Sequence, residues 1–176
     1  ITSTGAAMGN KVNITGDAVV TGSGDNGYEE DEAKTTNVGV YGAMSVRADN
    51  EGSLGTLSQN EVTISGNAKV SSVYGAYSES DSKVTGNKII INSGTTGVVE
   101  GSGVNKISGG YSKTGDVIEN IVEITGGTIN NFEIFGGSNG VELYEEGVNY
   151  DSPSNVNENQ VIITGGTINT NGGYIK

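Results

Sequence analysis

The sequence lacks cysteine, histidine and tryptophan, and it contains a single proline among its 176 residues. Without cysteine there are no disulfide bonds and no thiol chemistry. Without histidine there is no histidine general base and no Ser-His-Asp triad, and a zinc site with the usual nitrogen and sulfur ligands is excluded as well. The lone proline, with glycines that follow no three-residue period, excludes a collagen triple helix.

Positive charge is also scarce. The chain has 9 lysine and arginine residues and 21 aspartates and glutamates, which give a net charge of −12. Such an acidic chain repels nucleic acids and anionic membranes, so neither is expected as a partner. The longest apolar runs span only about four residues, so we expect no direct membrane insertion by this chain. No signal-peptide pattern opens the sequence, and its first residues read like the middle of a longer protein, so we expect a fragment.

Glycine is plentiful, at 30 of the 176 residues, and polar glycine-rich chains are often disordered. The apolar residues argue against disorder because they recur in one motif, Asn-x-(Val/Ile)-x-Ile-(Thr/Ser)-Gly, whose third copy has one extra residue. The five copies begin at Asn10, Asn60, Asn87, Asn120 and Asn159. Recurrence at variable spacing is typical of a repeat protein with insertions.

Two further elements follow within the repeats. A strand-like segment that ends in Gly-Ala or Gly-Gly recurs at residues 40–43, 73–76, 107–110 and 134–137. A weaker element aligns residues 66–70 with residues 126–130 and 165–169. All these segments are short, alternate in character and favour β-branched side chains, which is typical of β-strands.

Three short strands per repeat, with insertions at the corners, predict one coil of a parallel β-helix. We therefore expect a single all-β solenoid of about five coils over residues 1–176, with inserts at 22–37, 43–59 and 138–158. The rule for parallel crossovers makes the coil right-handed. Stacking would align the motif positions in inward ladders, which are Val12, Val62, Ile89, Val122 and Val161, then Ile14, Ile64, Ile91, Ile124 and Ile163.

Polar motif positions should also stack along the axis. The five leading asparagines would form a ladder in which side-chain amides hydrogen-bond to one another. On the outer face, Lys11, Glu61 and Lys88 would be consecutive neighbours of alternating charge, which is mildly favourable between adjacent strands. These columns give an independent check on the predicted register.

The repeats at residues 60–78 and 120–138 resemble those in the passenger regions of bacterial autotransporter-type surface adhesins. The first copy reads Asn-Glu-Val-Thr-Ile-Ser-Gly-Asn-Ala-Lys-Val and continues into Val-Tyr-Gly-Ala-Tyr-Ser. The resemblance covers most of the chain apart from the inserts. It implies a right-handed β-helix displayed outside the cell, at the bacterial surface, by a carboxy-terminal membrane barrel that lies beyond this sequence. It also implies adhesion, aggregation, biofilm formation or virulence as the function.

Aromatic residues supply the first candidate site. If Val40 and its counterparts point inward, the following residues point outward in a column, and exposed rings could stack on sugars or anchor a protein partner. The candidate ligand-binding residues are Tyr41, Tyr74, Phe135, Tyr77 and Tyr111. The opposite alternation would place the rings in the core, and the sequence leaves both arrangements open.

Carboxylates supply the second candidate site, in the first insert. The candidate metal ligands are Asp25, Glu29, Glu30, Asp31 and Glu32. Oxygen ligands at this density could hold Ca²⁺, the one cofactor that the sequence suggests. Their spacing fits neither the EF-hand nor the calcium-binding nonapeptide repeat. The alternative is a solvated acidic loop that keeps the rod soluble.

Three functional hypotheses follow from these observations. The first is a cell-surface adhesin that binds glycans or proteins of host or bacterial surfaces through its loops and one sheet face. The second is a structural stalk or self-associating fibre. The third is a β-helical polysaccharide lyase or hydrolase, but no carboxylate pair suited to glycoside hydrolysis stands out, and Arg47 does not cluster with the aspartates. We therefore expect no enzymatic activity.

Overall fold

The computed structural model describes residues 6–20, 39–45, 55–97, 105–130, 132–140, 154–169 and 175–176. The regular structure in these ranges consists of short β-strands, and the strands pair in parallel. The described residues contain no helix that is long and apolar enough to cross a membrane. The all-β parallel solenoid expected from the repeats is confirmed.

Four strand columns, which we call sheets A to D, make up the structure. Sheet A contains β1 (Ala7–Met8), β5 (Leu57–Ser58), β9 (Val84–Thr85), β14 (Val117–Ile118) and β19 (Val156–Asn157). Sheet B contains β2 (Lys11–Ile14), β6 (Glu61–Ile64), β10 (Lys88–Ile91), β15 (Ile121–Ile124) and β20 (Gln160–Ile163).

The other two columns complete each turn of the chain. Sheet C contains β3 (Val19–Val20), β7 (Lys69–Val70), β11 (Thr95–Thr96), β16 (Thr128–Asn130) and β21 (Thr167–Asn169). Sheet D contains β4 (Gly39–Ser45), β8 (Ser72–Ser78), β12 (Asn105–Ser108), β13 (Tyr111–Ser112), β17 (Phe132–Phe135) and β18 (Ser138–Asn139). After β21, Ile175 bridges to Ile134 and extends sheet D by one residue.

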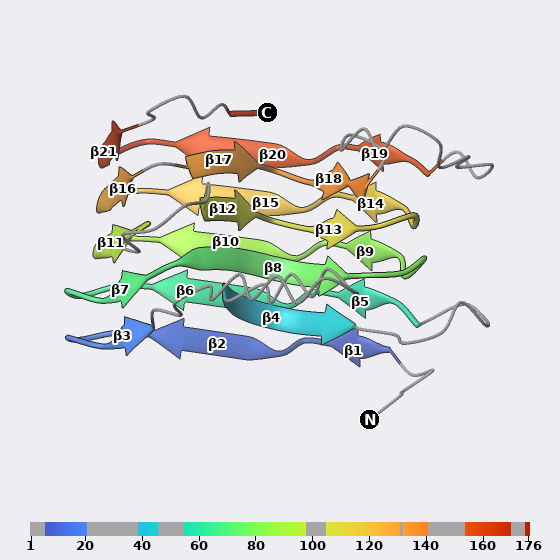
Figure 1. The fold of residues 1–176 in the computed structure, drawn as a ribbon, viewed down its shortest axis with the longest axis horizontal. Helices are drawn as coiled ribbons and strands as arrows, with labels where there is room; N and C mark the ends of the chain where they lie inside the picture. The colour runs from blue at the N-terminus through green and yellow to red at the C-terminus, as the bar shows by residue number, and fades with distance from the viewer. Residues whose placement is uncertain are drawn as a thin grey trace, which may run out of the picture.

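The chain passes through sheets A, B, C and D in that order before it starts the next coil (Figure 1). Coil 1 comprises β1–β4, coil 2 β5–β8, coil 3 β9–β13, coil 4 β14–β18 and coil 5 β19–β21. In Figure 1 the strands of sheet D run to the right in front of sheet B, whose strands run to the left, as the chain climbs from coil 1 to coil 5. This course is a right-handed coil, as expected.

Sheet A is the difference from the sequence prediction, which gave three strands per repeat rather than four. Its strands are only two residues long, whereas an alternating pattern needs four or more residues to be recognised. Register in sheet C also differs, because Val70 pairs with Thr96 and Thr96 with Ile129. The prediction had placed Val70 opposite Asn130. It missed that the B-to-C connection is one residue shorter after coil 2.

The register of sheet B is the predicted one. Val62 lies between Val12 and Ile89, and Ile64 lies between Ile14 and Ile91. The same alignment continues through β15 and β20. In the outward column, Lys11 pairs with Glu61 at 3.6 Å, whereas Lys88 reaches diagonally to Glu123 at 2.7 Å.

The asparagine ladder is also confirmed. In each coil the backbone N–H and the Nδ2 group of the leading asparagine both donate to Oδ1 of the asparagine in the next coil. The four steps from Asn10 to Asn159 have N···O distances of 2.8–3.1 Å. Nδ2 also donates back to a sheet A carbonyl of the preceding coil, as from Asn87 to Leu57 at 3.0 Å. Asn60, Asn87 and Asn120 are fully buried, and these bonds compensate for the loss of water.

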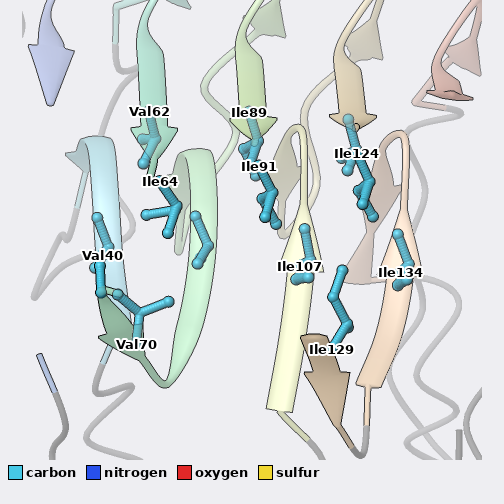
Figure 2. Close-up of a cluster of buried hydrophobic side chains, with 13 residues drawn as sticks. Val40, Val62, Ile64, Val70, Ile89, Ile91, Ile107, Ile124, Ile129 and Ile134 are labelled. Carbon is cyan, nitrogen blue, oxygen red and sulfur yellow. The ribbon is translucent and has the colours of Figure 1, made fainter. Parts of the chain in front are cut away.

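Two apolar clusters fill the interior. The larger cluster joins inward side chains of sheets B, C and D, and Figure 2 shows them stacked from coil to coil along the axis. Its most deeply buried members include Ile64, Ile91 and Ile124, each with 0% exposure. The smaller cluster joins Leu57, Val84 and Val117 of sheet A to alanines of sheet D. Each coil therefore buries its apolar side chains against its neighbours, although the sequence has little apolar content overall.

The predicted inserts overlap several strands at their ends. Residues 43–45 and 57–58 of the insert predicted at 43–59 belong to β4 and β5. Residues 138–139 and 156–157 of the insert predicted at 138–158 belong to β18 and β19. The insert predicted at 22–37 lies outside the described residues.

Candidate functional site

Sheet D differs from the other three sheets in the length of the segments that connect it to its neighbours. The A-to-B connection is two residues long in every coil, and the B-to-C connection is three or four residues long. By contrast, the C-to-D connection ranges from the single residue Ser71 to residues 21–38, and the D-to-A connection ranges from residues 113–116 to residues 140–155. Among the strands that the structure describes, the long connections are therefore those that enter or leave sheet D. We call the outer side of this sheet, with its two borders, the D face.

Two columns of side chains line the D face, on the side of the sheet opposite the core. The first column runs through Tyr41, Tyr74, Ser108 and Phe135, which occupy paired positions in successive coils. The second column runs through Met44, Tyr77, Tyr111 and Ser138. The valines and isoleucines that alternate with the first column lie in the core cluster, so the outward alternation is the one that the structure adopts.

The four tyrosines of these columns form one aromatic cluster. The rings of Tyr41 and Tyr74 stack with centroids 5.2 Å apart, and those of Tyr77 and Tyr111 stack at 4.9 Å. Edge-to-face contacts join the two pairs, with Tyr77 at 5.2 Å from Tyr74 and 5.8 Å from Tyr41. These are favoured aromatic geometries, so the cluster stabilises the sheet and fixes the orientation of each ring.

Burial divides the five sequence-predicted aromatic residues into two groups. Tyr74, Tyr77 and Phe135 are buried, with 6%, 8% and 5% exposure. Tyr41 and Tyr111 are half-buried. The column thus points outward without being an open row of rings, and contacts among the four tyrosines cover part of their rings.

Burial favours the protonated form of two phenols on the D face, those of Tyr41 and Tyr74. Burial, with a smaller contribution from Glu79, raises the pKa of Tyr41 to about 12. Burial raises the pKa of Tyr74 far above its ordinary value, and the neighbouring tyrosines and Glu133 add to the shift. Glu133 also pairs with Lys106 of the preceding coil at 3.7 Å. The D face therefore combines neutral O–H donors with nearby carboxylate acceptors.

Sequence reasoning missed the charged members of the D face, Glu79, Lys106 and Glu133, together with the exposed Met44. Lys106 and Glu133 occupy paired positions on β12 and β17. Once sheet D is in register, the alternation along these strands predicts that both side chains point outward. Glu79 directly follows β8, where alternation no longer gives the direction of a side chain.

The predicted calcium ligands Asp25, Glu29, Glu30, Asp31 and Glu32 lie outside the described residues, so Ca²⁺ binding stays a prediction. Among the residues that the structure describes, no group of three or more acidic side chains could hold a metal ion.

Comparisons with family models, with curated proteins and with solved structures find no match to this chain. The structure by itself defines the class, a parallel β-helical repeat protein with one face bordered by connections of variable length.

Proposed function

We propose that this chain is part of an extracellular adhesin of the autotransporter passenger type, which binds surface glycans or proteins of host or bacterial cells through the D face. The observation that carries the proposal is the confinement of the long connections to the two borders of sheet D. Loops on a rigid scaffold are where binding residues concentrate. The resemblance of the repeats to those of such adhesins supports the same function and the location at the cell surface.

The chemistry of the D face favours a glycan as the ligand. Half-buried Tyr41 and Tyr111 have fixed rings with part of their surface exposed, and aromatic rings pack against the apolar faces of sugars. Protonated phenols donate hydrogen bonds, while Glu79 and Glu133 can accept hydrogen bonds from sugar hydroxyl groups. The cluster holds its rings before a ligand arrives, so binding orders few side chains.

A border-shortened variant tests the proposal. Residues 21–38 are replaced by one serine, which copies the connection that Ser71 makes between β7 and β8. The variant should keep its melting temperature, since the core strands are unchanged, and should lose saturable binding to a printed glycan array and to cell monolayers. Tyr41→Ala and Tyr111→Ala should weaken the same binding, whereas Lys88→Ala on sheet B is the control that leaves it intact.

Two outcomes contradict the proposal. One is that the wild-type chain binds neither the array nor the cells above the level of an acidic control protein. The other is that the folded border-shortened variant and both tyrosine variants bind as well as wild type, which would place the binding surface elsewhere.

A further inference from the structure

Negative charge is unevenly distributed along the chain and is concentrated in the long connections of sheet D. The four longest connections between the described strands contain 12 of the 21 acidic residues and only 2 of the 9 basic residues. They are residues 21–38, 46–56, 97–104 and 140–155. These connections therefore carry a formal charge of −10 out of the −12 of the whole chain, and the rest of the chain is nearly neutral.

We propose that the ligand of the D face is a cationic glycan, a polysaccharide whose sugars carry protonated amino groups. This inference rests on the proposed function and names the class of glycan that it would bind. An aromatic surface with acidic borders complements a sugar that combines an apolar ring face with an ammonium group. The same borders repel a sulfated or carboxylated glycan.

Glu79 and Tyr41 together supply the two contacts that an amino sugar needs. Glu79 directly follows β8, and its backbone N–H donates to the carbonyl oxygen of Ser45, the last residue of β4, at 3.0 Å (Figure 1). Tyr41 lies on β4 and is half-buried, so part of its side chain is open to a ligand. The carboxylate of Glu79 is close enough to contribute to the raised pKa of the Tyr41 phenol. A sugar that packs on the Tyr41 ring can therefore place its ammonium group near this carboxylate, in a charge-assisted hydrogen bond.

The described strands of sheet D carry little positive charge that would oppose such a ligand. Their charged residues are Lys106 and Glu133, and Nζ of Lys106 lies 3.7 Å from a carboxylate oxygen of Glu133, which compensates its charge. Every aromatic residue of the described strands also lies in sheet D. Aromatic side chains and acidic connections thus coincide on this face and on no other described sheet.

Calorimetric titration with three oligosaccharides of equal length tests the class of ligand. The probes are an oligomer of glucosamine, its N-acetylated form and a sulfated form, and EDTA is present so that no divalent cation neutralises the acidic connections. Wild type should bind the glucosamine oligomer about tenfold or more tightly than the N-acetylated oligomer, and the sulfated oligomer more weakly still. Added NaCl should weaken binding of the glucosamine oligomer, because salt screens exposed charges.

Glu79→Gln and Glu119→Gln form a matched pair, since each substitution removes one negative charge. Glu119 lies in an A-to-B connection, outside sheet D and its borders. Its counterpart Gln59 has φ 55°, close to the 59° of Glu119, so glutamine is compatible with this position. Glu79→Gln should weaken binding of the glucosamine oligomer about fivefold, whereas Glu119→Gln should change it less than about twofold. Neither substitution should alter the melting temperature or binding of the N-acetylated oligomer.

Three outcomes overturn the inference. They are binding of the N-acetylated or sulfated oligomer as tight as that of the glucosamine oligomer, equal effects of Glu79→Gln and Glu119→Gln, and tighter binding of an oligolysine of equal charge, which would make a basic protein the better ligand. Each of these leaves the proposed function in place. A wild-type chain that binds neither the glycan array nor cells contradicts the proposed function itself, so the two failures are distinguishable.

Discussion

At the residue scale, the asparagine ladder shows how a polar group can be part of the core. Asn87 is fully buried, and its amide makes hydrogen bonds to the coil before it and the coil after it. A buried polar network contributes to stability and specificity only when its members are satisfied. Every described inner coil repeats the same set of partners, so the ladder fixes the register between coils as well as satisfying its own groups.

The substitution Asn87→Asp tests this role. It places a carboxylate oxygen against Oδ1 of Asn120 and the carbonyl oxygen of Leu57, which now accept bonds of 2.9 and 3.0 Å. We expect a loss of about 3–5 kcal/mol in the free energy of unfolding at neutral pH, as for an uncompensated buried charge. Burial raises the pKa of the new carboxyl in the folded state, so the loss should be smallest below about pH 4 and grow as the pH rises.

Urea unfolding at acidic and neutral pH measures this loss. Asn13→Asp serves as the control, because Asn13 is an exposed residue of the same motif, and it should change stability by about 0.5 kcal/mol or less. Equal effects of the two substitutions would mean that the ladder is not a buried network.

The stability of the fold should decrease at alkaline pH, because the pKa values of Tyr41 and Tyr74 are raised in the folded state. The unfolded chain releases these protons near pH 10 and the folded chain only at higher pH. Stability is therefore full below about pH 10 and falls as the pH rises above it. In Tyr74→Phe, the free energy of unfolding should fall less steeply over this range. Identical slopes in the two proteins would contradict the burial of the Tyr74 phenol.

At the scale of the elements, close packing between coils depends on the third residue of the strand-like segment in sheet D. A Cβ atom on Gly109 would collide with the carbonyl oxygen of Gly136, and one on Gly75 with that of Gly109. These glycines have ordinary φ values, so the requirement for glycine comes from space alone. The spacing of sheet D strands is thus set by residues without side chains.

Gly109→Ala should therefore cost about 3 kcal/mol, because the backbones of two coils must move apart. Gly86→Ala is the comparison, since its Cβ would lie 4.0 Å from the nearest atom, in Gln59, and its cost comes from a positive φ, about 1 kcal/mol. Thermal unfolding of both variants measures the difference. A Gly109→Ala variant as stable as Gly86→Ala would show that coils in sheet D are not closely stacked.

The length of each strand decides how well its face and register can be predicted from the sequence. Four-residue strands such as β6 and β10 alternate clearly, so their faces and register follow from the pattern of residues. The two-residue strands of sheet A carry too few residues for alternation to be recognised. The burial of the candidate site could not be predicted for another reason. Alternation gives the direction of Tyr74, but the rings that contact it are Tyr41 of the preceding coil and Tyr77 three residues further along.

At the scale of the whole molecule, the A-to-B connection is two residues long in every coil and the B-to-C connection three or four, whereas the two connections of sheet D vary widely in length. The short connections keep sheets A, B and C close to one register from coil to coil. The long connections leave the described strands of sheet D stacked in register, because an insertion at a corner does not disturb the strands on either side of it. Under the proposed function, this division would let one face carry binding residues on an otherwise repetitive scaffold.

Motif positions far apart in the sequence stack in one column of the β-helix, and the distance between two spin labels in such a column can be measured directly. Asn13 and Ile162 are exposed on sheet B, and pairings through Thr63, Ile90 and Glu123 align them four coils apart. The chain has no cysteine, so Asn13→Cys together with Ile162→Cys takes labels at these two sites alone. Pulsed electron spin resonance, with unlabelled protein in excess to suppress contacts between copies, should give a narrow distribution about a backbone separation of about 19 Å. A broad distribution centred at a much longer distance would contradict the stacked β-helix.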